Sequence, residues 1–391
     1  MNKALEVLFV FLRLGFISFG GPIAHIGYFQ DEFVNKKKWL TEKEYVDIVS
    51  LCQFIPGPAS SQVGMVIGRL RAGFIGSILA WIGFTLPSAL LMISFALGIL
   101  HYPELFPRKI LHGFKIVAVV VVAQALLQMG GKFCYEKKRI FIFLVSLLFL
   151  SFMQNAIGQI IVILVGGLLG KILLREESRE NAKVQWSWYL SSFFTILFFL
   201  LILFLIPILE NYFPFAFIQL LGGFYKTGAL VFGGGHVVLP LLKEEMVANG
   251  FVKNEVFLSG YGFAQTLPGP LFSVAAFLGS ASSVGLDSVI CGLLSVTAIF
   301  LPGFLLVYGF FPLWEQIKNL DSFQSIVSGI NSSVYAILFF AFYDPIYRTT
   351  ILSVKDFTIS VLLFSLLQFW KLPIWLIVIL SPVLVYLMSF G

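Results

Sequence analysis

The chain has 391 residues, of which 59% are hydrophobic and only 12% are charged. Because a soluble domain carries about 25% charged residues, this composition excludes an ordinary soluble protein and indicates an all-α polytopic membrane protein. The formal net charge of +6 does not indicate nucleic-acid binding, because most basic residues lie in short loops beside apolar segments, as membrane topology requires.

Thirteen apolar runs follow one another along the chain. The first run lacks a basic leader and a small-residue cleavage site, so we expect a first membrane segment rather than a signal peptide. Several runs in the second part of each half are shorter than the roughly 20 residues of a straight membrane helix, which predicts tight helical hairpins. The runs are 4–21, 46–66, 73–100, 112–130, 140–153, 157–174, 189–209, 216–235, 257–281, 287–311, 326–343, 354–370 and 373–390.

One polar linker, Arg175–Lys183, divides these runs into two sets of six and leaves 189–209 as an extra connecting helix. We therefore predict an N-terminal domain over 1–174, a linker and connecting helix over 175–210, and a C-terminal domain over 211–391.

The two halves repeat an unusual pattern. The stretches FLRLG…FGGP (11–22) and QFIPGP (53–58) recur roughly 213 residues later as FYKTG…FGGG (224–235) and QTLPGP (265–270). Paired breaks at corresponding positions of two apolar halves point to the binding site of a transporter. Further matches join Glu32 with Glu245, Glu42 with Glu255 and, after a small insertion, Pro87 with Pro302.

The sequence gives conflicting indications about whether the two halves are parallel or inverted. Thirteen crossings would make the second half an inverted copy of the first. If 46–66 and 257–281 are re-entrant, each half crosses five times and the halves become parallel. Counting loop Lys and Arg favours the parallel version, whereas inverted repeats are common in transporters.

The Pro-Gly-Pro breaks are candidate anion sites. A helix that begins near Pro58 would leave free amide groups at Ala59, Ser60 and Ser61, and free amides at a helix N-terminus bind anions. The alternative is a purely structural kink. The predicted substrate ligands here are Ser60, Ser61, Gln62 and Gln53 in the first half and Gln265 and Ser273 in the second, and the breaks are Pro56, Gly57, Pro58, Pro268, Gly269 and Pro270.

Two cations, Arg13 and Lys226, lie about nine residues inside the first apolar run of each half, or roughly 14 Å deep. An intramembrane cation is a functional hypothesis by default, and two of them could neutralise a divalent anion. The alternatives are snorkelling or pairing with a carboxylate such as Glu6 or Glu32.

A third set of candidates surrounds the glycine-rich breaks, where glycine permits unwound backbone or close approach to a ligand. The breaks are Gly20, Gly21 and Pro22, then Gly233, Gly234 and Gly235; candidate proton-carrying or gating residues nearby are His25, Glu32, His236 and Glu245. A histidine there could titrate during transport, although a satisfied polar residue is the plainer interpretation.

No enzyme signature stands out. The sequence contains no Walker A motif, no His-Glu-x-x-His and no Gly-x-Ser-x-Gly, so we predict neither catalysis nor a cofactor or metal. The cysteines Cys52, Cys134 and Cys291 are far apart in apolar context and are interpreted as packing residues.

These motifs resemble the long, two-domain members of the chromate ion transporter family. The resemblance rests on FLRLGFISFGGPIAHIGYFQDEF…WL and LCQFIPGPASSQVGMVIG in the first half, and on GALVFGGGHVVLPLLKEE, AQTLPGPLFSVAAFLG and AIFLPGFLLVYG in the second. It covers nearly the whole chain and implies two homologous, inverted domains and gradient-driven export of chromate that confers resistance. Arg69 departs from the family pattern, in which an aromatic residue is common, and this leaves substrate preference open.

The sequence therefore predicts a multi-pass secondary transporter of the bacterial cytoplasmic membrane, with a chromate-like or sulfate-like dianion as substrate. The alternatives are an importer or exchanger of sulfate or another oxyanion, an uncoupled anion channel and, last, a membrane-embedded enzyme. Besides the bilayer, the only other partner considered is a second copy, through Gly166-x-x-x-Gly170, a motif that could equally serve internal packing.

Overall fold

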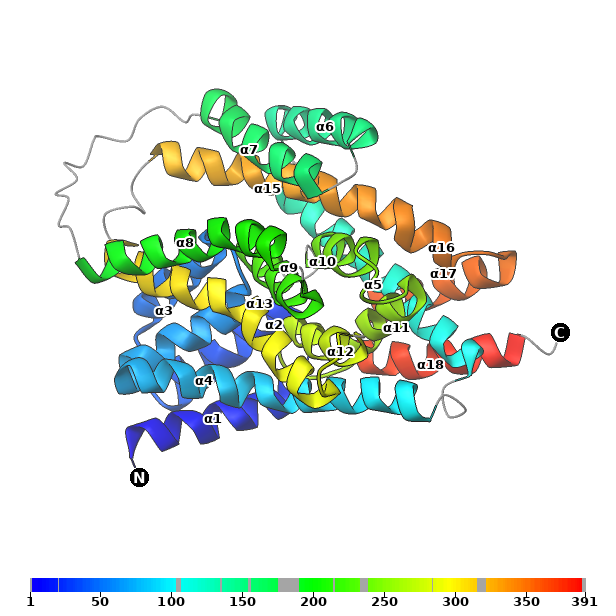
Figure 1. Cartoon of the computed structure of the whole chain (residues 1–391), viewed down its shortest axis with the longest axis horizontal. Helices are drawn as coiled ribbons and strands as arrows, with labels where there is room; N and C mark the ends of the chain where they lie inside the picture. Colours follow the sequence, from blue (N-terminus) through cyan, green and yellow to red (C-terminus); the bar gives the residue numbers. More distant parts are fainter. Residues whose placement is uncertain are drawn as a thin grey trace.

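The computed structural model of the chain describes residues 2–19, 21–102, 107–133, 136–153, 156–174, 190–213, 215–232, 238–282, 284–314 and 321–388. Within these ranges the fold is all-helical, and most of the long helices lie side by side (Figure 1). The predicted class is confirmed. Five described helices are long and apolar enough to cross a membrane: Ala59–His101, Lys109–Leu127, Leu190–Tyr212, Ser288–Leu313 and Gln324–Thr350. The predicted residues Gly20, Gly233–Gly235, His236 and Cys134 and the linker Arg175–Lys183 lie outside the described residues.

The helices of the two halves follow the same order. The first half and the connecting helix contain α1 (Lys3–Ile17), α2 (Gly21–Gln30), the π-helical η1 (Asp31–Lys36), α3 (Glu42–Phe54), α4 (Ala59–His101), α5 (Arg108–Phe133), α6 (Lys137–Phe152), α7 (Ala156–Leu173) and α8 (Leu190–Tyr212). The second half contains α9 (Ala216–Leu230), α10 (Val238–Lys243), η4 (Glu244–Ala248), α11 (Asn254–Ala264), η5 (Leu271–Ser273), α12 (Val274–Ala281), α13 (Ser288–Phe310), η6 (Phe311–Leu313), α15 (Asp321–Ala341), η7 (Phe342–Tyr347), α16 (Arg348–Thr350), α17 (Val354–Gln368) and α18 (Ile374–Met388).

The first half opens with two helical hairpins that enter the protein and turn back. α1 runs inward, and α2 with η1 returns, so that Lys37 Nζ lies 3.4 Å from a carboxylate oxygen of Glu6 in the first turn of α1. α3 runs inward to the Pro-Gly-Pro break and α4 returns, so that Arg71 Nη2 lies 2.8 Å from the same carboxylate group. We call this end of the molecule, marked by Lys37, Arg69 and Arg71, the basic face.

α4 is two helices joined by a sharp reversal. Ala72 and Gly73 have non-helical backbone, and Gly73 has φ +67°, which suits glycine because it has no Cβ. After the reversal the Ser77 hydroxyl donates to the Met65 carbonyl at 2.8 Å, so the two segments pack antiparallel. The second segment, 74–101, rises about 42 Å at 1.5 Å per residue and crosses the whole molecule.

The second half enters from the other end, where α4 ends and α5 begins; we call it the opposite face. There the Ser259 hydroxyl of α11 contacts the Leu111 carbonyl of α5 at 3.2 Å. At the basic face, the guanidinium of Arg69 lies 4.3 Å from the ring centre of Tyr308 near the end of α13. α13 therefore crosses in the direction opposite to α4, and the prediction of inverted halves is confirmed.

This arrangement resolves the conflict over orientation. The sequence-based count treated the run 4–21 as a crossing, but α1 ends at Ile17 and the chain turns back. Among the described residues, the first segments of the first half form two hairpins that turn back, and the long second segment of α4 is the first to run from one end of the molecule to the other. The halves are therefore inverted while the loop cations Lys37, Arg69 and Arg71 still share one face.

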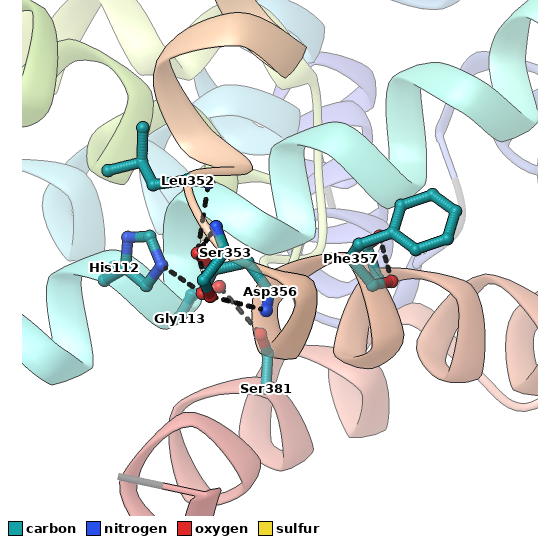
Figure 2. Close-up of polar contacts among 8 residues, drawn as sticks. His112, Gly113, Leu352, Ser353, Asp356, Phe357 and Ser381 are labelled. Carbon is teal, nitrogen blue, oxygen red and sulfur yellow. Dashed lines mark hydrogen bonds and ion pairs between the residues drawn. The ribbon is translucent and has the colours of Figure 1, made fainter.

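The last two helices of each half pack on the long helix of the other half. α6 and α7 lie against α15, where the hydroxyls of Ser146 and Ser333 are 2.8 Å apart. α17 and α18 lie against α5, where the Ser381 hydroxyl donates to the Gly113 carbonyl at 2.7 Å (Figure 2). The halves are thus interlocked at both sides of the molecule.

The Gly166-x-x-x-Gly170 motif belongs to this interlocking. A Cβ added at Gly170 would lie 2.8 Å from the Cα of Gly329 on α15, closer than real Cβ atoms approach. Small residues let membrane helices pack this closely. The motif serves internal packing, and a homodimer remains a separate prediction.

Candidate functional site

The two halves meet where their helices break. The backbone amide of Gly57, in the first Pro-Gly-Pro break, donates to the carbonyl of Val231 at 2.7 Å, and the amide of Gly269, in the second, donates to the carbonyl of Ser18 at 2.9 Å. Ser18 and Val231 are the residues that follow α1 and α9, so these two bonds are symmetry equivalents. We call the two breaks together with Ser18 and Val231 the central junction.

Both junction glycines are required by geometry. Gly57 has φ +124° and Gly269 has φ +95°, a region that side chains disfavour. A Cβ at Gly57 would lie 2.7 Å from the Gln62 amide nitrogen and 3.2 Å from the Gly303 Cα. A Cβ at Gly269 would lie 3.0 Å from the Ser88 hydroxyl oxygen. Each break therefore fits against the crossing helix of the other half.

The helix start after the first break agrees with the prediction. α4 begins at Ala59, with Pro58 as its N-cap, and Ser60 and Ser61 are buried. The first amides of a helix have no partner within that helix, so those of Ala59, Ser60 and Ser61 remain available to a ligand.

The second break differs. Residues Leu271–Ser273 form a single 3-10 turn after Pro270, and α12 begins only at Val274. The Ser273 amide already donates to the Pro270 carbonyl at 3.0 Å. Phe272 points into the core against Phe300, with ring centres 5.8 Å apart. Because this turn already pairs the Ser273 and Val274 amides, the first break offers more free amides.

His25 connects the two hairpins of the first half and is almost fully buried. Its Nε2 lies 3.1 Å from the Ser18 carbonyl, which can only accept, so Nε2 carries the hydrogen. In the neutral ring Nδ1 then accepts from the Ser60 hydroxyl at 3.2 Å. The Ser18 carbonyl thus receives hydrogen bonds from both His25 and Gly269.

Several polar atoms at or beside the junction are buried without a hydrogen-bond partner within the described residues. Buried polar groups are normally paired, and each exception calls for an explanation such as a bound ion or water. All but one of these groups can donate a hydrogen bond. They are the hydroxyls of Ser18, Ser61, Thr85 and Thr227, the amide nitrogen of Gln265 and the amide oxygen of Gln62.

The two predicted glutamines of the first half have different positions. The Gln62 amide nitrogen donates to the Pro56 carbonyl at 2.9 Å and to the Gly303 carbonyl at 3.3 Å, so this side chain joins the halves. Gln53 is exposed and does not point into the junction. Of the predicted second-half ligands, Ser273 is buried and Gln265 is half-buried.

The two intramembrane cations each have a carboxylate partner. Arg13 pairs with Glu32, whose side chain is only 5% exposed, whereas Glu6 is occupied by Lys37 and Arg71. Lys226 Nζ lies 2.9 Å from a Glu210 oxygen and 4.0 Å from a Glu245 oxygen. Glu32 and Glu245 match in the repeat, so both halves place an acid beside the cation of their first helix.

Arg69 and Arg71 anchor the basic face. Arg69 lies over the rings of Tyr308 and Phe311 from the other half, and Arg71 lies over Trp39 while it binds Glu6. These contacts favour a role in anchoring the loop over a role in attracting an anion. They also show how an arginine fits a position beside aromatic rings.

A cavity of about 520 Å³ lies beside the junction, between α7, α8, α9 and α15. Its lining includes Pro56, Leu230 and Phe232, and Lys171 is its one charged side chain. An anion in this cavity would lose its hydration and gain only the Lys171 ammonium as a charged donor, among otherwise apolar walls. The cavity therefore suits hydrocarbon rather than substrate.

Sequence reasoning missed four residues of this region. Ser18, Thr85 and Thr227 are single hydroxyl residues inside apolar runs, and their isolation among apolar neighbours was the only available signal. Glu210 directly follows the connecting run 189–209, and its partnership with Lys226 depends on the packing of α8 against α9.

Comparison with known proteins gives a consistent result. The family model described as chromate transporter matches residues 5–171 and 218–386, one match in each half. An uncharacterized transporter of Methanocaldococcus jannaschii is 27% identical over 98% of this chain and 94% of its own length. A probable chromate transport protein of Synechococcus elongatus is 27% identical over 82% of this chain and 79% of its own. A chromate transport protein of Pseudomonas aeruginosa is 24% identical, covering 84% and 77%. No solved structure matches.

Proposed function

Because the chain belongs to the chromate transporter family, we propose that it is a secondary active transporter that exports chromate and thereby confers chromate resistance. The proposed substrate is a tetrahedral dianion, and sulfate has the same shape and charge. In the proposed orientation the basic face, with its loop cations Lys37, Arg69 and Arg71, lies in the cytoplasm. The proposed location is the cytoplasmic membrane of a bacterium.

The observation that carries this proposal is the set of unpartnered donors at the central junction. A dianion that leaves water must exchange its hydration for dipoles and donors. The free amides at the start of α4 and the hydroxyls of Ser18, Ser61 and Thr85 supply these in the first half. Thr227 and Gln265 supply fewer in the second half.

The charged pairs on the helices that lead to the junction support a coupled mechanism rather than a simple pore. Arg13 is neutralised by Glu32, and Lys226 faces two carboxylates, Glu210 and Glu245. A dianion entering beside these groups adds negative charge to a set that has no free cation. Its arrival therefore requires either displacement of a carboxylate or uptake of a proton, and Glu245 is our candidate for the proton carrier.

The reciprocal amide bonds also favour a carrier over an uncoupled channel. Gly57 and Gly269 bind the carbonyls of Val231 and Ser18 directly, which holds the two breaks together. A substrate path through this point requires the halves to move apart. That movement is what alternating access demands of inverted repeats.

The test is a flux assay in proteoliposomes with radiolabelled chromate, sulfate and molybdate, each with an imposed pH gradient or membrane potential. We expect flux of chromate above that of empty liposomes, competition by sulfate, and stimulation by a gradient. Equal flux in protein-containing and empty liposomes for all three anions would refute the proposed function. Gradient-independent flux with single-channel currents would favour the channel.

A further inference from the structure

A second cavity, of about 290 Å³, opens at the opposite face, far from the basic face along α4. It lies where α5 and α11 begin and α18 ends, and the contact of Lys355 Nζ with the Met388 carbonyl at 3.0 Å places the start of α17 there too. In Figure 1 these helices gather around the labels α5, α11 and α18. Its lining residues are Lys109, Leu111, His112, Lys115, Glu255 and Val385.

Half of the lining residues are lysine or histidine, and one of these side chains has no partner. Lys115 is half-buried and has no hydrogen bond or ion pair among the described residues. Burying an ammonium group without a counter-charge is costly, so a residue of this kind faces either solvent or an anion. Lys109 is different, because its ammonium lies 5.5 Å from the ring centre of Tyr386.

His112 is held in place from the other half. Its Nε2 lies 2.8 Å from Asp356 Oδ1, and Asp356 is fixed by accepting hydrogen bonds from the Ser353 amide and hydroxyl at the start of α17 (Figure 2). A carboxylate accepts only, so Nε2 donates. The ring is therefore oriented before any ligand arrives.

The cavity is connected to the central junction by one helix. α11 begins at Asn254 beside the cavity and leads to Gln265, and ten residues from Glu255 to Gln265 span about 15 Å. Gly262 of this helix packs against the carbonyl of Phe114 on α5. The cavity is thus the outer end of the same hairpin whose inner end carries the second break.

We propose that this cavity is an anion-capture vestibule, which binds a tetrahedral divalent oxyanion through the ammonium groups of Lys115 and Lys109, with the fixed ring of His112 as one wall, before it moves along α11 to the junction. Glu255, in the same lining, opposes the anion and limits how tightly it is held. The vestibule rests on the proposed function. It adds that the face opposite the basic loops, from which exported chromate leaves, also takes up oxyanion, as an exchanger requires.

The pair of substitutions Lys115→Gln and Glu255→Gln tests the vestibule, because its charges predict effects of opposite sign. With anion offered from the opposite face in oriented vesicles, Lys115→Gln raises the KM for sulfate by about threefold or more, and Glu255→Gln lowers it. The maximal rate changes little in both. With anion offered from the basic face, both variants match the wild type. Lys43→Gln, which removes an exposed lysine of α3, is the control for loss of one positive charge.

A KM for Lys115→Gln equal to that of the wild type, or equal changes at both faces, would overturn the vestibule. If the wild type carries no oxyanion, the proposed function fails first, and equilibrium binding of radiolabelled sulfate to purified protein then decides the vestibule alone. There, weaker binding in Lys115→Gln supports the vestibule and unchanged binding overturns it.

Discussion

An alanine at Gly57 or Gly269 is expected to lower oxyanion flux by at least about tenfold while the protein still inserts into the membrane. Both residues have positive φ, and an added Cβ would meet the crossing helix of the other half. Backbone strain of this kind costs about 1–3 kcal/mol, and about 1.4 kcal/mol is tenfold in rate. Initial flux in proteoliposomes, normalised to the amount of inserted protein, measures the effect.

The control variant Gly285→Ala separates backbone strain from the clash of the added Cβ with the other half. Gly285 has φ +78°, so alanine strains the backbone there in a similar way, but no atom lies within 4 Å of the added Cβ. We expect this variant to retain most of its flux. If Gly285→Ala loses as much flux as Gly57→Ala, the effect comes from backbone strain in general and the close approach at the junction has no special role.

The second large effect is expected at the Arg13 pair. Arg13→Gln leaves the buried carboxylate of Glu32 without its counter-charge. Removing one partner of a buried pair costs about 3–5 kcal/mol, but the Arg13 side chain is 56% exposed, so we expect about 1–3 kcal/mol here. Thermal unfolding in detergent should show a lower midpoint for this variant.

Adding Glu32→Gln to Arg13→Gln should restore most of that stability, because the double variant no longer has an unpaired buried carboxylate. The double variant then reports on transport without the complication of unfolding. If Arg13 also binds the anion, the double variant is stable but transports poorly. Wild-type flux in the double variant would show that Arg13 only neutralises Glu32, and failure to recover stability would contradict the pairing itself.

The sequence was sufficient to place the helix breaks but not to show how the two breaks meet at the junction. Glycine and proline have strong local preferences, so the breaks around Gly57 and Gly269 and the helix start at Ala59 follow from neighbouring residues alone. The unequal polarity of the two breaks was also visible, since Phe272 and Val274 stand where the first half has Ser60 and Gln62.

What could not be predicted depends on contacts between distant segments. An apolar run such as 4–21 looks the same whether the helix crosses or turns back at Ser18. The bond from Gly57 to Val231 and the pairing of Lys226 with Glu210 require the fold to be known. The same is true of the vestibule, where Lys115 and Glu255 come from different halves.

The central claim is that the oxyanion binds at the junction, and an anomalous-scattering map from crystals of the protein grown with molybdate tests it most directly. Molybdate is a tetrahedral dianion with a heavy central atom. We predict a peak within hydrogen-bonding reach of the Ser61 hydroxyl and the first amides of α4, with or without a second peak beside Lys115. Bound molybdate with no peak at the junction would contradict the account.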